Sequence, residues 1–171
     1  VALLGTFDER FLALPKEALI TSMQEHQKYF PVENKTGELL PFFITISNIK
    51  SSNPEQVISG NERVIRPRLA DTVFFYDADK KTTLENKRDA LKSVVFQKNL
   101  GSLYDKTERL SGLAEFLSPL VGAEVALSKR AAKLCKSDLV SEMVGEFASL
   151  QGVMGRYYAI NDEEHPEVAE A

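Results

Sequence analysis

The sequence predicts an α+β fold, in which a segment that contains a helix and a β-hairpin, residues 1–100, precedes a helical segment, residues 101–171. Two runs rich in aromatic and β-branched residues, 28–33 and 39–46, flank a turn sequence and indicate the hairpin. Apolar residues repeat at helical spacing through most of the remaining chain. We place the boundary between the two segments near residues 99–102.

The first expected helix extends from Leu14 to Gln24 and ends near His26. Pro15 suits its first turn, because the N–H that proline lacks would be unpaired there in any residue. Apolar side chains recur on one face of this helix, at Leu19, Ile20 and Met23.

The expected hairpin joins residues 28–33 and 39–46 through Asn34-Lys35-Thr36-Gly37. Pro31 and Pro41 cannot donate the hydrogen bonds that hold a sheet together. We therefore expect them at strand ends, at bulges or on an edge strand.

Two further helices are expected between the polar linker 47–53 and Gly101. Asn61 is a residue type that can cap the first of them. Its apolar stripe advances by three or four residues and consists of Ile65, Leu69, Val73 and Tyr76. The second helix is expected from Leu84 to about Phe96, before Gly101 breaks it.

The helical segment begins with an expected helix at residues 103–117 and a turn at Pro119 and Gly122. One long helix is then predicted at residues 123–147, because apolar residues recur at every fourth position and form a ridge. The ridge residues are Ala131, Cys135, Leu139, Met143 and Phe147. Residues 163–171 are acidic and poor in core-forming side chains.

The charge distribution excludes a protein that coats nucleic acid over its whole surface, because the net charge is −4. Residues 60–98 depart from this average and carry nine Lys or Arg against six Asp or Glu. The middle of the chain is therefore its basic part.

Cys135 is the only cysteine, which excludes an internal disulfide framework and a multi-cysteine zinc site. A reducing cytoplasm is the expected compartment. No stretch approaches the roughly 18 apolar residues of a membrane helix. The start at Val1, in an apolar strand-like run without an initiating Met, leads us to expect an excised internal fragment.

Three pairs of stretches together resemble the beta subunit of the bacterial two-alpha, two-beta glycyl-tRNA synthetase. They are LPKEALI at 14–20 with QEHQKYFPV at 24–32, GNERVIRPRLAD at 60–71 with FFYDAD at 74–79, and DLVSEMVGEF at 138–147 with LQGVMGRYYA at 150–159. The resemblance spans residues 1 to about 160, which is far more than one short motif.

The resemblance implies a fragment of a noncatalytic subunit. In that family the class II core that activates glycine lies in the alpha subunit, and the beta subunit chiefly binds and positions the tRNA. The expected partners are therefore the alpha subunit and glycine tRNA, in the cytoplasm and without a membrane. ATP and magnesium serve the complete enzyme, whereas this fragment is expected to hold no cofactor and to be inactive alone. Residues 101–171 would correspond to the start of an HD-like domain.

An HD-type phosphohydrolase is the enzymatic alternative, but its metal ions need several histidines and an adjacent His-Asp pair. The chain has only His26 and His165 and no such pair, so we expect an HD-like scaffold without the metal site. Cys135 is expected to be a buried, inert core residue. Gly152 and Gly155 favour close helix packing, because the Lys-Ser/Thr of a phosphate-binding loop is missing.

The basic middle segment is the one candidate binding surface, because an arginine fork can donate two hydrogen bonds to a phosphate. The candidate RNA-phosphate contacts are Arg63, Arg66, Arg68, Lys80, Lys81, Lys87 and Arg88, followed by Lys92 and Lys98. One alternative is local ion pairing of the arginines with Glu62, Asp71 or Asp77. Another is a structural module that holds the alpha subunit and does not touch RNA.

Overall fold

The computed structural model describes residues 1–171 and contains two compact units, an N-terminal unit of residues 1–77 and a C-terminal unit of residues 78–171. The α+β class is confirmed. The units divide ahead of the boundary predicted at 99–102, because residues 78–100 pack with the helices that follow them. The assignment of the helical segment to an HD-like domain stays a prediction.

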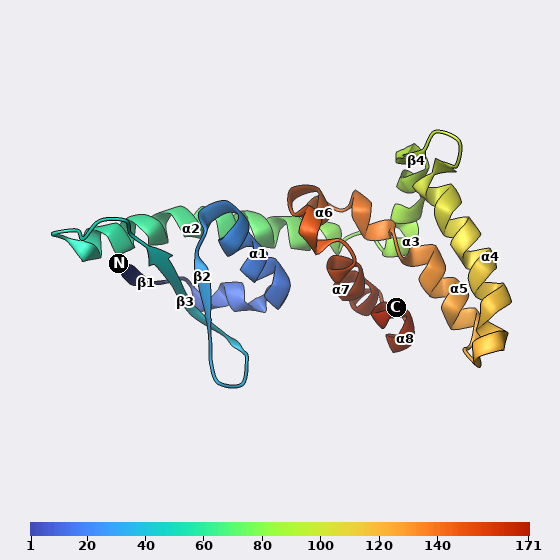
Figure 1. Ribbon diagram of the computed structural model, residues 1–171, viewed down its shortest axis with the longest axis horizontal. Helices are drawn as coiled ribbons and strands as arrows, with labels where there is room; N and C mark the ends of the chain where they lie inside the picture. Colours follow the sequence, from blue (N-terminus) through green and yellow to red (C-terminus); the bar gives the residue numbers. More distant parts are fainter. The chain divides into compact units, whose positions relative to one another are not determined.

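The N-terminal unit contains a three-stranded antiparallel sheet in the order β1-β3-β2 (Figure 1). The strands are β1, Ala2–Thr6; β2, Phe30–Glu33; and β3, Leu39–Ile46. The hairpin predicted at β2 and β3 is confirmed. Asn34 closes its turn, because the Asn34 Oδ1 atom accepts hydrogen bonds of 2.9 Å from the backbone N–H groups of Thr36 and Glu38. Pro31 lies in the edge strand β2, where the register shifts, as expected.

Two helices cover the inner face of this sheet. Helix α1, Lys16–Gln27, confirms the first predicted helix, and a 3-10 helix, Glu9–Ala13, precedes it. Helix α2, Pro54–Asp79, bonds to α1 through the hydroxyl groups of Thr72 and Ser22, 3.0 Å apart. The core between these elements consists of Phe11, Leu14, Leu19, Met23, Tyr29, Phe43, Ile65 and Leu69.

The prediction that Asn61 begins a helix is wrong, because α2 already begins at Pro54. Asn53 Oδ1 accepts the backbone N–H of Gln56 at 3.2 Å, so Asn53 and Pro54 provide the start signal. Asn61 lies inside the helix, where its Oδ1 accepts a 2.6 Å hydrogen bond from the Tyr29 hydroxyl.

The C-terminal unit begins with the last two residues of α2, Ala78 and Asp79, and continues with the short helix α3, Leu84–Lys87. The helix predicted from Leu84 to Phe96 is wrong beyond α3, where a 3-10 helix at Arg88–Ser93 and the strands β4, Val95–Gln97, and β5, Gly101–Ser102, follow. Valine and phenylalanine favour a strand here. Gly101 has a φ of 82°, which allows the tight hairpin between the two strands.

Helices α4, Leu103–Val121, and α5, Val125–Leu134, lie side by side in Figure 1. A capping box of Ser102 and Asp105 begins α4, and Gly122, with a φ of 73°, ends it. The buried residues of α4 are small, namely Thr107, Ser111 and Ser118. Its large apolar residues Leu113, Phe116, Leu117, Leu120 and Val121 are exposed instead.

The single helix predicted at residues 123–147 is wrong, because α5 ends at Leu134. A 3-10 helix at Ser137–Val140, helix α6 at Glu142–Glu146 and a 3-10 helix at Ala148–Leu150 follow. Ser141 caps α6 by accepting the N–H of Val144, so a new helix begins there. The ridge therefore does not exist as one surface, although Met143 and Phe147 are buried separately.

Helices α7, Val153–Asn161, and α8, Pro166–Glu170, complete the C-terminal unit. The tail expected to be poor in core residues contributes Val168 and Ala169, both of which are buried. Val168 and Ala169 therefore belong to the core of the C-terminal unit, although the spacing of apolar residues in the sequence did not predict this.

Candidate nucleic-acid interface

Helix α2 carries three exposed arginines. It buries Ile65 and Leu69 in the N-terminal core and leaves Arg63, Arg66 and Arg68 on its surface. Arginine is suited to phosphate because its planar group donates several hydrogen bonds in a fixed geometry. The sequence prediction that these side chains could meet a phosphate is therefore compatible with their exposure.

The alternative interpretation, in which neighbouring acidic residues pair with these arginines, does not apply to Glu62. Glu62 Oε1 accepts hydrogen bonds of 2.8 Å from the backbone N–H and from the hydroxyl of Thr6. Asp71 is exposed and forms no ion pair with Arg66 or Arg68. The arginines therefore do not use their donors on Glu62 or Asp71.

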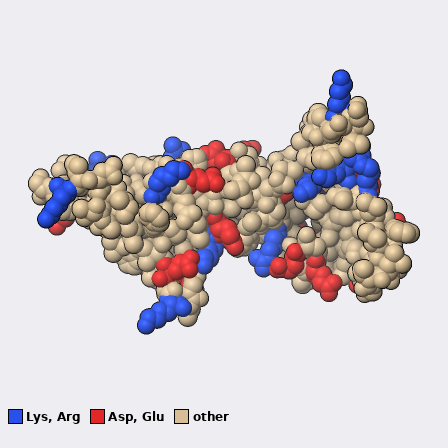
Figure 2. All heavy atoms as spheres, in the orientation of Figure 1, with Lys and Arg blue, Asp and Glu red and all other residues tan.

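The three arginines do not form one continuous surface. Each residue turns a helix by roughly 100°, so Arg66 and Arg68 point about 160° apart, whereas Arg63 and Arg66 are only about 60° apart. Blue and red groups are interspersed over the face drawn in Figure 2. A single phosphate backbone could therefore meet Arg63 and Arg66 together, but not Arg66 and Arg68.

Arg66 has acidic surroundings. It borders a hollow of about 290 Å³ whose lining includes Asp8 and Glu62. Carboxylates that line the same hollow weaken the attraction of Arg66 for an anion. Arg63 lies outside this hollow and is the better placed of the two.

The two lysines that follow α2 differ in exposure. Lys81 is exposed and Lys80 is half-buried. Both lie in the turn between α2 and α3. They remain candidates for phosphate contact, in which each lysine would supply a mobile, point-like charge.

Lys87 serves the fold. Its ammonium group donates hydrogen bonds to the backbone carbonyls of Asp79, the last residue of α2, at 2.6 Å, and of Thr82, in the turn that follows, at 2.7 Å. Burial lowers the pKa of Lys87, while the carboxylates of Asp79 and Asp162 oppose that shift. Lys87 thus places its positive charge at the C-terminus of α2, a common position for a cation.

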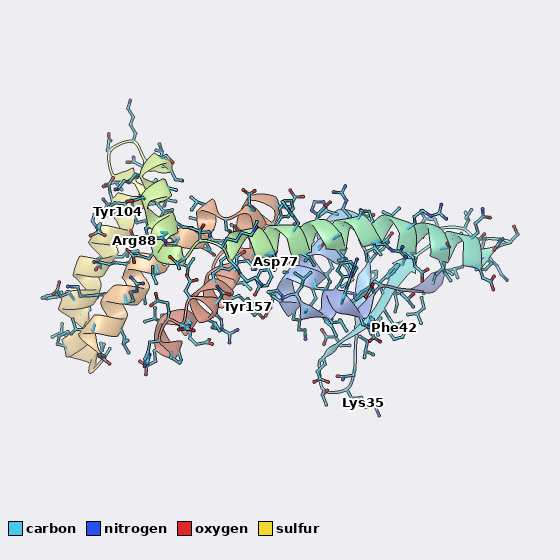
Figure 3. The ribbon with its side chains drawn as sticks, turned by 180° about the vertical axis from the view of Figure 1, so that it is seen from behind. Lys35, Phe42, Asp77, Arg88, Tyr104 and Tyr157 are labelled. Carbon is cyan, nitrogen blue, oxygen red and sulfur yellow. The ribbon has the colours of Figure 1, made fainter.

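Arg88 corrects the sequence interpretation most clearly, because it is a buried residue with 8% exposure. Its guanidinium group donates to Glu85 at 3.0 Å, to Glu108 at 2.5 Å and to the Lys133 carbonyl at 3.1 Å. It also lies over the ring of Tyr104, and Figure 3 labels both residues. With its donors used inside the protein, Arg88 is not available to a phosphate.

A second arginine completes this cluster. Arg130 of α5 pairs with Glu85 and with Glu164. Burial alone would raise the pKa of Glu85, but hydrogen bonds from Arg88 and Arg130 hold that pKa below its ordinary value. Five side chains from separate elements therefore form one structural ion-pair cluster.

An open groove lies beside the β4–β5 hairpin. It has a volume of about 660 Å³, and Lys92, Lys98 and Tyr104 are among the residues that line it. Lys106, from the first turns of α4, lies 4.1 Å from the centre of the Phe96 ring. Sequence reasoning stopped at residue 98 and missed Lys106. The available signal was a basic residue in the first turn of the helix that follows a hairpin of aromatic and basic residues.

The residues weighed for metal or thiol chemistry have structural surroundings. No three His, Cys, Asp or Glu side chains come together to hold a metal ion. His165 Nδ1 accepts the N–H of Glu167 at 3.3 Å and caps α8. Cys135 is half-buried, so the prediction of a buried residue was too strong, and burial raises the pKa of its thiol.

The two-glycine motif binds a carboxylate of the protein itself. Asp138 is buried, and its Oδ2 accepts the backbone N–H groups of Gly152 at 2.5 Å and Gly155 at 3.2 Å. Burial raises the pKa of Asp138, and these two N–H groups counteract the shift. A Cβ atom on Gly155 would lie 3.3 Å from Asp138 Oδ2, so the close packing predicted at Gly155 is confirmed. At Gly152 the prediction is wrong, because a Cβ atom there would meet nothing within 4 Å, and this glycine instead supplies a φ of 83°.

The comparison with known families places this two-unit α+β chain among the aminoacyl-tRNA synthetase subunits. The family described as "Glycyl-tRNA synthetase beta subunit" matches residues 1–171, and the chain belongs to that family. The resemblance noted in the sequence is thereby confirmed.

Relatives support the same assignment along the whole chain. Glycine-tRNA ligase beta subunits of Marinobacter nauticus and Coxiella burnetii are 56% and 55% identical over 171 residues. That of Pseudomonas putida is 53% identical over 169 residues, or 99% of this chain. The chain spans 25% of the length of each of these relatives. None of the helices combines the length and the apolar character that a membrane-spanning helix requires.

Proposed function

We propose that the chain acts as part of the noncatalytic beta subunit of glycine-tRNA ligase, in ATP-dependent glycylation of tRNA in the cytoplasm. The alpha subunit of the complete enzyme would supply the glycine-activating site and use ATP and magnesium. Residues 1–171 alone would be inactive. The C-terminal unit would be an HD-like scaffold that has kept its helices without a metal site. Family membership over the whole chain supports this proposal.

Direct contact with tRNA phosphate is the more specific part of the proposal. The observation that carries it is the exposure of Arg63, Arg66 and Arg68 without ion-pair partners. We keep these three residues with Lys80 and Lys81 as candidate contacts. We remove Lys87 and Arg88, because their donors are used within the C-terminal unit.

The test is tRNA binding by the complete alpha and beta enzyme at several salt concentrations. The variants are Arg63→Ala, Arg66→Ala and the double change, and Lys35→Ala at the tip of the β2–β3 hairpin (Figure 3) serves as a charge-matched control. Each lost phosphate contact should flatten the slope of log affinity against log salt by roughly one unit, similarly for different RNA sequences. Arg68→Ala is measured separately, because it points to the other side of α2.

An unchanged affinity and slope in the folded double variant would remove Arg63 and Arg66 from the interface. The second candidate function, subunit packing without RNA contact, would then be favoured. One observation supports it independently: α4 exposes Phe116 at 69% and Leu120 at 71%. Such a stripe suits a helix of the alpha subunit. In that case Phe116→Asp would weaken assembly with the alpha subunit and leave tRNA affinity of the assembled enzyme unchanged.

A further inference from the structure

The central strand of the N-terminal sheet is apolar on both of its faces. Side chains alternate along a strand, so Phe43 of the core defines the inner face of β3. The outward positions of β3 are Leu40, Phe42, Ile44 and Ile46. All four are apolar, and Phe42 is labelled in Figure 3. A strand that faced water on one side would alternate apolar and polar residues instead.

The neighbouring strands extend this apolar surface. Leu4 of β1 and Phe30 of β2 both lie opposite Ile44, and Ala2 lies opposite Ile46. Together they form what we call the outer sheet face: Ala2, Leu4, Phe30, Leu40, Phe42, Ile44 and Ile46. Leu4 is 53% exposed, Phe30 54% and Ile46 55%.

The composition of the outer sheet face indicates what kind of surface covers it. It carries no charged side chain. Thr6, which lies opposite Phe42 at its edge, donates its hydroxyl to Glu62, so the face offers no cation for an RNA phosphate. Transient protein interfaces are about as polar as the remaining surface, whereas permanently covered surfaces are more apolar. The composition therefore indicates that another apolar layer covers the outer sheet face permanently in the complete protein.

We infer that this cover comes from the same polypeptide, so that the outer sheet face is a second hydrophobic core of the full-length beta subunit. The length of the relatives supports this occupant, because residues 1–171 account for only 25% of each. The position of the face also supports this occupant, because the same strand, β3, contributes side chains both to the core of the N-terminal unit and to the outer sheet face. A sheet apolar on both faces needs both layers when it folds, before another subunit binds. This inference does not depend on RNA contact.

Cysteine accessibility in the full-length beta subunit tests the inference. Ile46→Cys and Leu4→Cys place thiols on the outer sheet face. Lys35→Cys in the hairpin turn is the exposed reference, and Phe43→Cys is the buried one. Maleimide labelling of each peptide is followed by mass spectrometry, with the beta subunit alone and with the alpha subunit. Thermal melting confirms that each variant is folded.

The expected result is protection in the beta subunit alone. Ile46→Cys and Leu4→Cys should be labelled at least about tenfold more slowly than Lys35→Cys, because labelling requires local opening of the covering layer. Addition of the alpha subunit should not change these rates. Labelling as fast as at Lys35→Cys under both conditions would show a free face and overturn the inference. Protection that arises only with the alpha subunit would also overturn it, because the partner would then be the cover.

Discussion

Replacement of Asp79 by Ala should loosen the C-terminal unit around the start of α6. Asp79 is the last residue of α2 and is 4% exposed. Its carboxylate accepts the N–H groups of Glu142 at 2.9 Å and Met143 at 3.0 Å, at the start of α6. It also accepts the hydroxyl of Tyr158, at 2.7 Å, from α7. One side chain thus joins three helices.

The magnitude follows from these three hydrogen bonds. A hydrogen bond to a charged group contributes about 1.5–3 kcal/mol, and a buried group left without its partner costs about 1–3 kcal/mol. Asp79→Ala leaves two N–H groups of α6 and the Tyr158 hydroxyl without their acceptor. Because such contributions are not additive, we expect a loss of about 3–5 kcal/mol. Tyr158→Phe removes one bond and leaves the α6 cap intact, so we expect only about 1–1.5 kcal/mol.

Hydrogen exchange of the full-length beta subunit measures this difference locally. Every 1.4 kcal/mol corresponds to a tenfold change in an equilibrium constant, so amides of residues 142–147 should exchange roughly 100-fold faster or more in Asp79→Ala. Tyr158→Phe should accelerate them roughly tenfold or less. Equal acceleration by both variants would refute the reasoning, because the capping of α6 would then contribute nothing beyond the Tyr158 bond.

Two further predictions concern the core and the thiol. Gly5→Ala should destabilise the N-terminal unit by about 1–3 kcal/mol in denaturant unfolding, because overpacking forces side chains to move, and the new Cβ atom would lie 2.4 Å from Phe43 Cζ. Phe43→Leu in the same chain should recover part of this loss, and no recovery would contradict the assigned clash. Cys135 should react with a thiol reagent more slowly than a free cysteine at neutral pH, with a rate that still rises above pH 9.0, its ordinary pKa, because burial raises that pKa. Labelling as fast as a free cysteine would contradict this prediction.

Local signals predicted the N-terminal fold well. The turn at Asn34 and the proline at the start of α1 act within a few residues, so the sequence alone located the β2–β3 hairpin and α1. The start of α2 was missed because Asn61 is a residue type that often caps helices. Its side chain instead bonds Tyr29, which lies far away in the sequence.

Long-range partners explain what the sequence could not provide. Arg88 is buried because Glu108 and the Lys133 carbonyl reach it from α4 and α5, and no spacing rule reveals such partners. The residue type predicted a phosphate contact, whereas tertiary packing gave the guanidinium group internal acceptors. The exposed positions of Arg63 and Arg66 agree with the prediction because helical periodicity alone separates them from the core face.

The central place of β3 in the sheet sets the order in which the sheet can assemble. β1 and β2 both pair only with β3, which is the last of the three strands in the chain. The β2–β3 hairpin closes over a short turn, while β1 must join across the whole of residues 7–38, and the entropy lost in closing a loop grows with its length. During synthesis β1 therefore waits without a partner until β3 has emerged. Formation of the sheet therefore depends on one strand, because neither β1 nor β2 can pair before β3 is available.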